Sequence, residues 1–218
     1  MKLLLTSAGI SNNSIKKALF DLVGKRPEET SLAFIPTASN VEKGDKGWLI
    51  KDLLTLKELN LQSISIVDVS AVDRNVWEPQ LQEADILFFG GGNTFHLMEW
   101  VSKSGLAGLL PEFLKTKIYV GVSAGSMIVS PDLILNISQK LYEEDLERTE
   151  NLSGLNFVDF YVLPHYNSPH FSLRIKENVL SATNGIKKKI YVLDDMSAVK
   201  FDNGNAEIVS EGKFLELN

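Results

Sequence analysis

The chain contains no cysteine, and this absence removes several chemistries together. Disulfide bonds, thiolate metal sites and a cysteine nucleophile are all excluded. With only three histidines and no His-Glu-x-x-His pattern, the sequence also lacks a recognisable catalytic metal site. We therefore expect no metal and no other cofactor.

Long apolar runs and a basic charge balance are also missing. No stretch approaches the roughly 20 apolar residues that cross a bilayer. The apolar start at residues 3–5 is too short for a signal core, and polar Asn12 and Asn13 follow at once. The net charge of -6 offers no electrostatic footprint for nucleic acid or an anionic membrane. These features predict a cytoplasmic protein without a nucleic-acid or membrane partner.

Short buried strands alternate with amphipathic helices over the first part of the sequence. Strand patterns cover residues 3–6, 32–35, 63–69, 84–89 and 118–122. Helix patterns cover residues 15–22, 48–59, 94–101 and 106–114. Strands separated by helices predict an α/β fold with a mostly parallel sheet and helices on both faces.

The pattern weakens after residue 130. We expect a polar segment over 130–152 with a short helix near 141–146, and a further helix over 171–181. Strands are expected over 157–164 and 189–193, followed by a hairpin that turns at residues 202–205. Neither a repeat nor a linker interrupts the chain, so a single domain over 1–218 is expected.

A Gly-Val-Ser-Ala-Gly sequence occupies residues 121–125, where the last of the early strands ends. Gly-x-Ser-x-Gly at a strand-to-helix junction is typical of a nucleophile elbow, which exposes the serine hydroxyl above the sheet. Ligands of open α/β sheets bind at the carboxyl ends of the strands. Ser123 is therefore the candidate nucleophile.

A nucleophilic serine needs a base, and His165 is the preferred candidate because it follows a strand and a proline at the expected active edge. His170 is a rival in a polar loop, whereas His96 is expected on the surface of a helix. A third group should orient the imidazole. The paired acids Asp194 and Asp195 end a strand, and the reserve acids are Asp159 and Asp132.

The negative oxygen of a tetrahedral intermediate needs preorganised N–H donors. Ala124, directly after the serine, offers one donor. The glycine loop at residues 90–92 can offer a second, because no Cβ obstructs its backbone. This loop lacks the spacing of a dinucleotide site and of a P-loop.

Three motifs together resemble one known family. They are Gly90-Gly91-Gly92-Asn93-Thr94-Phe95, Gly121-Val122-Ser123-Ala124-Gly125-Ser126 and Pro164-His165-Tyr166-Asn167. In this order they resemble the aspartyl dipeptidase (dipeptidase E) family of serine peptidases, with cyanophycinase as a more distant relative. The resemblance implies a fold similar to class I glutamine amidotransferases and cleavage of dipeptides or short peptides, in the namesakes those with an N-terminal aspartate.

The resemblance also implies roles for individual residues. Ser123 would be the nucleophile, His165 the base and Asp195 the third member, with Gly92 and Ala124 as oxyanion donors. Two candidate substrate-binding residues are added, Asn93 of the glycine loop and Arg174. Arg174 either binds a substrate carboxylate or lies on the surface of a helix. Met196 stands where a glycine usually follows the acid.

The leading hypothesis is a monomeric or homodimeric serine peptidase that acts on short peptides through an acyl-enzyme. One alternative is an α/β-hydrolase-type esterase, although that fold orders its triad as serine, acid, histidine, and here the marked acids follow His165. The other alternative is a non-catalytic binding module that keeps the fold.

Overall fold

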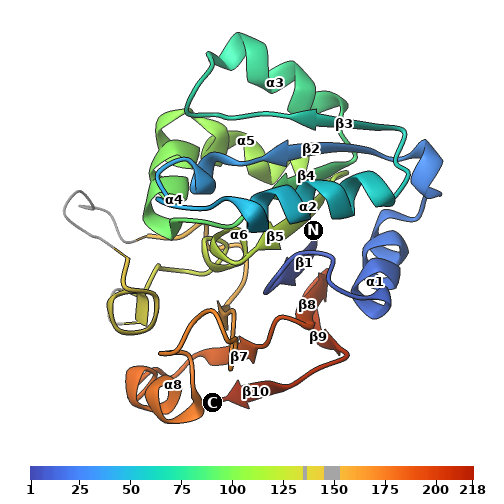
Figure 1. Cartoon of the computed structure of the whole chain (residues 1–218). Coiled ribbons are helices and arrows are strands. Elements are labelled where there is room, and N and C mark those ends of the chain that lie inside the picture. The colour runs from blue at the N-terminus through green and yellow to red at the C-terminus, as the bar shows by residue number, and fades with distance from the viewer. Residues whose placement is uncertain (135–136, 145–152) are drawn as a thin grey trace.

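The computed structural model describes residues 1–134, 137–144 and 153–218, and a seven-stranded sheet is its central element (Figure 1). The strand order is β3-β2-β4-β5-β1-β8-β9. The bounds are β1 Lys2–Thr6, β2 Ser31–Ile35, β3 Ser63–Ile66, β4 Ile86–Phe89, β5 Ile118–Val122, β8 Ser197–Asp202 and β9 Asn205–Ser210. The strands from β3 to β1 are parallel, whereas β8 and β9 are antiparallel additions. The predicted mostly parallel α/β sheet is confirmed.

Helices cover both faces of this sheet, as predicted (Figure 1). Helices α1 (Asn13–Val23) and α2 (Gly47–Glu58) pack on one face, and α3 (Arg74–Glu83), α4 (Thr94–Lys103) and α5 (Leu106–Phe113) on the other. Side chains alternate between the faces along each strand. Both sets are apolar because both faces are covered, which explains the continuous apolar runs.

The strands on either side of the predicted base and acid form a second sheet of three strands, although all the site residues were expected at the edge of one sheet. It has the order β10-β7-β6, with β6 Phe160–Leu163, β7 Lys189–Leu193 and β10 Phe214–Leu217. One face contributes Phe160 and Val162 to the main core, and the other packs with α8 (Lys176–Ala182). Strands β6 and β7 are therefore buried on both faces, whereas β10 is a more exposed edge strand, so the apolar sequences of β6 and β7 do not reveal which sheet they join.

Some predicted elements differ in extent. The helix expected over 171–181 begins only at Lys176, because residues 171–175 form a loop against the site. Helix α3 was not predicted, since Pro79 and many polar residues obscure the spacing of its buried Trp77 and Leu81. In the polar segment, Ser138–Tyr142 forms a short π-helical turn, and residues 145–146 of the expected helix lie outside the described residues.

The remaining strand and hairpin predictions agree more closely. The hairpin of β8 and β9 turns at Asn203 and Gly204, both with positive φ, which is the geometry of a tight two-residue turn. In the part of the chain that the structure describes, no helix combines the length and apolar character needed to cross a membrane.

Candidate active site

Ser123 occupies a strained turn between β5 and the short helix α6 (Ala124–Met127). Its backbone has φ 49° and ψ -108°, a region that non-glycine residues rarely adopt. A Cβ on Gly121 would lie 2.6 Å from the backbone of Gly125, and a Cβ on Gly125 would lie 2.3 Å from the carbonyl oxygen of Phe89. Both glycines are therefore required by the close packing of α6 on β4 and β5.

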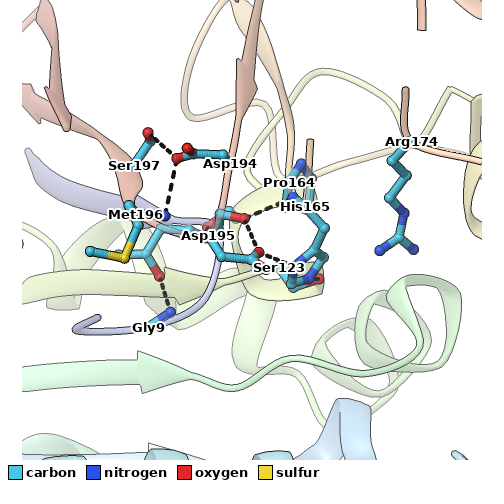
Figure 2. Close-up of polar contacts among 12 residues, drawn as sticks. Gly9, Ser123, Pro164, His165, Arg174, Asp194, Asp195, Met196 and Ser197 are labelled. Atoms are coloured by element: carbon cyan, nitrogen blue, oxygen red, sulfur yellow. Dashed lines mark hydrogen bonds and ion pairs between the residues drawn. The ribbon is translucent and has the colours of Figure 1, made fainter. Parts of the chain in front are cut away.

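His165 lies directly beyond β6 and faces Ser123 (Figure 2). Its Nε2 is 2.9 Å from Ser123 Oγ, and its Nδ1 is 2.6 Å from Asp195 Oδ1. Asp195 lies in the turn between β7 and β8. The three side chains thus come from the ends of β5, β6 and β7, and the histidine and acid belong to the second sheet rather than to the edge of the main one.

Ser7, at the end of β1, is a site residue that sequence reasoning did not assign. Its buried hydroxyl accepts a hydrogen bond from the His165 backbone N–H at 2.7 Å and donates one to Asp195 Oδ1 at 3.2 Å. It therefore fixes the base and the acid relative to β1. A serine after a first strand carries no local signal for this role.

The charges of the site follow from burial and hydrogen bonding. Burial lowers the pKa of His165 and outweighs the hydrogen bond to Asp195, which raises it. Burial raises the pKa of Asp195, but hydrogen bonds from His165 and Ser7 outweigh this effect and lower the pKa to about 2. At neutral pH the imidazole is thus neutral and Asp195 ionised. Asp195 then accepts from Nδ1–H, so Nε2 can accept the proton of Ser123.

The rival acids have other partners. Asp194 Oδ1 accepts from Met196 N–H at 3.0 Å and from the Ser197 hydroxyl at 2.5 Å, which stabilises the turn after β7. Asp159 pairs with Lys188 on the surface, and Asp132 accepts from the Tyr161 hydroxyl at 2.7 Å. Among the described residues, Asp195 is the acid that contacts His165.

The rival histidines lie elsewhere. His170 is exposed. His96 was expected on a helix surface, but the structure places it half-buried on α4, next to Trp100. It lies on the predicted helix and outside the contacts of Ser123.

The glycine loop lies against Ser123. A Cβ on Gly91 would be 3.4 Å from Ser123 Cβ. Gly92 has φ 132°, and a Cβ there would be 2.2 Å from the carbonyl oxygen of Ala38, so no other residue fits. Within the described part of the chain, neither Gly92 N–H nor Ala124 N–H donates to another residue.

Asn93 caps helix α4. Its Oδ1 accepts from His96 N–H at 2.9 Å, and its own N–H donates to Ala38 O at 2.9 Å. The two Nδ2 protons of Asn93 have no acceptor among the described residues. Asn93 thus has a structural role and a remaining donor beside the glycine loop.

Arg174 is buried, with 5% of its surface exposed, so the expectation of a surface helix residue is wrong. The guanidinium carbon lies 3.5 Å from the ring centroid of Phe171 and 4.0 Å from that of Tyr142. Phe171 also packs on His165, with ring centroids 4.6 Å apart. Nε donates to Leu141 O at 3.3 Å, whereas Nη1 is buried without a partner among the described residues.

An elbow serine that contacts a histidine, which in turn contacts a carboxylate, is the arrangement found in serine hydrolases. A family model narrows this class. The model described as Peptidase family S51 matches residues 3–209. The chain belongs to this family of serine peptidases, which confirms the resemblance to dipeptidase E.

Similar proteins agree with this assignment. An "uncharacterized peptidase Lin0382" of Listeria innocua is 32% identical over 81% of this chain and 87% of its own length. A "Peptidase E" of Streptomyces coelicolor is 29% identical over 78% of this chain and 65% of its own length. A crystal structure from Listeria monocytogenes, provisionally ascribed to peptidase E, has a TM-score of 0.79 at 26% identity and covers 97% of this chain and 98% of that one.

Proposed function

We propose that this chain hydrolyses dipeptides or other short peptides through an acyl-enzyme on Ser123. The observation that carries the proposal is the continuous series of contacts from Ser123 Oγ to His165 Nε2 and from His165 Nδ1 to Asp195. Membership of family S51 and the similarity to proteins named Peptidase E support the substrate class.

In the first step, Ser123 Oγ attacks the carbonyl carbon of the peptide bond while His165 Nε2 takes the hydroxyl proton. The imidazolium that forms is stabilised by the ionised carboxylate of Asp195. The strained backbone of Ser123 orients the hydroxyl before substrate arrives, so little reorganisation is needed during attack.

The tetrahedral intermediate places a negative charge on the former carbonyl oxygen. Ala124 N–H and Gly92 N–H are the proposed donors to this oxygen. Ala124 directly follows Ser123, and Gly92 belongs to the glycine loop that packs beside Ser123. Neither N–H has another acceptor within the described residues. Donors of this kind contribute about 3 kcal/mol each to stabilising the transition state.

The intermediate collapses when His165 gives its proton to the leaving amine, which departs and leaves an ester on Ser123. Water then attacks the ester carbonyl while His165 takes a proton from it. The second tetrahedral intermediate collapses as His165 returns this proton to Ser123 Oγ, and the acyl part of the substrate leaves as a carboxylic acid. Each half-reaction returns the histidine to its neutral form, so the lowered pKa of His165 suits catalysis at neutral pH.

Arg174 is the proposed anchor for a substrate carboxylate. Its unpartnered Nη1 can form a charge-assisted hydrogen bond, and its contact with Phe171 places the cation one ring away from His165. The Nδ2 group of Asn93 offers an additional donor. A carboxylate this close to the reacting bond belongs to a short peptide, either at its C-terminus or on an N-terminal aspartate.

The test compares wild type, Ser123→Ala and His165→Ala on a panel of Asp-Xaa and other dipeptides. We expect turnover to fall at least about 10³-fold in both variants. A fluorophosphonate probe should label wild type at Ser123 and leave Ser123→Ala unlabelled. Ser126→Ala is the matched control, because the buried Ser126 hydroxyl donates to Thr6 O. Wild-type turnover by Ser123→Ala would falsify the mechanism.

A further inference from the structure

Strand β3 is an edge of the main sheet, and within the described part of the chain it pairs with β2 alone (Figure 1). Val67 N–H, directly after β3, donates to Phe34 O at 2.8 Å. Backbone groups alternate in direction along a strand, so Ser65 also faces β2. The N–H and C=O groups of Ile64 and Ile66 therefore point outward, where another strand could pair with them.

This edge lacks the features that usually prevent pairing with another chain. Charged side chains and prolines protect most exposed sheet edges. At the opposite edge of the same sheet, β9 carries Glu207, which pairs with Lys200. Strand β3 reads Ser-Ile-Ser-Ile, without charge or proline, and Ile64 and Ile66 are 37% and 59% exposed.

Both isoleucines lie on the face of the sheet that α1 and α2 cover. Ile64 is in register with Leu32, and Ile66 with Phe34. Leu32 and Phe34 belong to the core beneath these two helices. Residues in register on neighbouring strands point to the same face, so the exposed isoleucines continue this core beyond its edge.

Helix α2 adds two exposed apolar residues to the same edge. Asp52 lies on the flank of α2 that is nearer to β1, because its Oδ1 is 3.2 Å from the position of a Cβ on Gly9. Ile50 and Leu54 are two residues before and after Asp52, about 200° away around the helix. They therefore face the β3 edge, and they are 56% and 55% exposed.

We propose that β3 pairs antiparallel with β3 of a second copy, across a two-fold axis at Ser65, and so forms a homodimer. In this register Ile64 of each copy exchanges both backbone hydrogen bonds with Ile66 of the other. The two outward-facing residues of each strand are then satisfied by the same two residues of the other. The contact is isologous, so it closes as a dimer and does not propagate into a fibre.

The flanks of α2 meet across the same axis. Helix α2 joins two parallel strands, so it runs antiparallel to β3 and ends near the level where β3 begins. With a rise of about 1.5 Å per helical residue and about 3.3 Å per strand residue, Leu54 lies near the level of Ser65. We therefore expect Leu54 of the two copies to be close to the axis.

A second copy fits this surface better than an extended peptide does. Stable interfaces bury about 800 Å² on each partner, more than a strand of four residues supplies. A peptide would pair with β3 but leave Ile50 and Leu54 in water, whereas a second copy brings its own α2 against them. The inference does not depend on the proposed peptidase function.

Cysteine substitution tests the register, because the chain has no cysteine of its own. The two Ser65 residues form the pair without backbone hydrogen bonds at the axis, with Cα atoms about 4.5 Å apart, which a disulfide can span. Ser65→Cys should therefore form a disulfide-linked dimer on mild oxidation, measured by electrophoresis without reductant. The matched control is Ser63→Cys, which is more exposed but lies opposite Val67 of the second copy and should crosslink at least about 10-fold less.

Sedimentation of the protein without cysteine tests the interface itself. We expect wild type to be mainly dimeric at about 50 µM, with a Kd of about 10 µM or lower. Ile66→Lys should weaken the dimer at least about 100-fold, because a charge would be buried against Ile64 of the second copy. Leu180→Lys makes the same kind of change at a leucine of α8 that is 44% exposed, and it should leave the dimer intact.

Monomeric wild type at about 50 µM overturns the inference. It is also overturned if Ile66→Lys remains dimeric, or if Ser63→Cys crosslinks as readily as Ser65→Cys. Thermal unfolding of each variant shows whether it is folded, and the crosslinking result decides the matter if Ile66→Lys is not. None of these measurements uses turnover, so failure of the dimer and failure of the peptidase proposal are separable.

Discussion

Replacing Asp195 by asparagine removes the charge that faces His165 Nδ1 at 2.6 Å. In the ground state this interaction is modest, because 34% of the Asp195 side chain is exposed to solvent. It strengthens when His165 becomes an imidazolium during attack, since a hydrogen bond between two charged groups is worth about 3 kcal/mol. The asparagine amide can also donate to Nδ1, which would place the proton on Nε2, where Ser123 needs an acceptor.

Together, these effects predict that Asp195→Asn lowers kcat about 10³-fold or more. This decrease corresponds to a loss of about 4 kcal/mol of transition-state stabilisation. The change in KM should be small, because Asp195 does not contact the substrate. Steady-state kinetics on the best dipeptide of the panel measures both quantities. Thermal unfolding of the same samples shows whether the variant remains folded.

The adjacent acid supplies the control. Asp194→Asn keeps an oxygen that can accept from Met196 N–H, and it lies outside the contacts of His165. We expect kcat within about threefold of wild type and a loss of about 1 kcal/mol in the free energy of unfolding. The assignment of Asp195 is refuted if Asp195→Asn retains kcat within tenfold of wild type, or if both variants lose activity equally.

Further predictions concern the supporting residues. Ser7→Ala should lower kcat/KM about 10- to 100-fold, because the buried His165 N–H loses its acceptor; unchanged kinetics would contradict this role. Gly125→Ala should destabilise the fold by at least about 3 kcal/mol in denaturant unfolding, whereas Gly108→Ala, with open space around its Cβ in α5, should stabilise by about 0.5–1 kcal/mol. Because burial raises the pKa of Glu144 to about 7 in the folded protein, wild type should lose free energy of unfolding as pH rises from about 4.5 to 7, and Glu144→Gln should not. The free energy of unfolding of the variant relative to wild type should therefore increase by about 3 kcal/mol over this range. A difference that does not change with pH would refute the raised pKa. Because the pKa of His165 is lowered, the midpoint of the fall in kcat/KM on acidification should lie below pH 6.5, and a midpoint above this value would contradict the burial of the imidazole. The free energy of unfolding should also decrease as pH falls below about 6.5, because the unfolded chain binds the proton more tightly.

Several site features were predictable because their causes are local. The spacing of Gly121, Ser123 and Gly125 reflects steric limits on a single tight turn, so the motif is visible in the sequence. The alternation of strands and helices similarly reflects burial of both sheet faces. The position of His165 after a strand and a proline was a weaker local signal, and the structure brings it to Ser123.

Other features depended on contacts that no local pattern encodes. A helix surface was one of the two places expected for Arg174, yet its loop folds back so that Tyr142 and Phe171 enclose the guanidinium. Glu144 lies in a polar, acidic stretch that resembles ordinary solvated surface. Its hydrogen bond to Thr94 and the burial of Oε2 distinguish it from the exposed neighbour Glu143.

The sequence by itself determined the fold class, the elbow at Ser123 and the set of acids from which a partner for His165 could come. Tertiary structure decided among those acids, separated β6 and β7 into a second sheet and placed Ser7 between Asp195 and His165. The physical reason is the range of each interaction. Turn geometry and side-chain periodicity act between near neighbours in the chain, whereas the hydroxyl of Ser7 and the carboxylate of Asp195 are 188 positions apart and meet only after both sheets have packed.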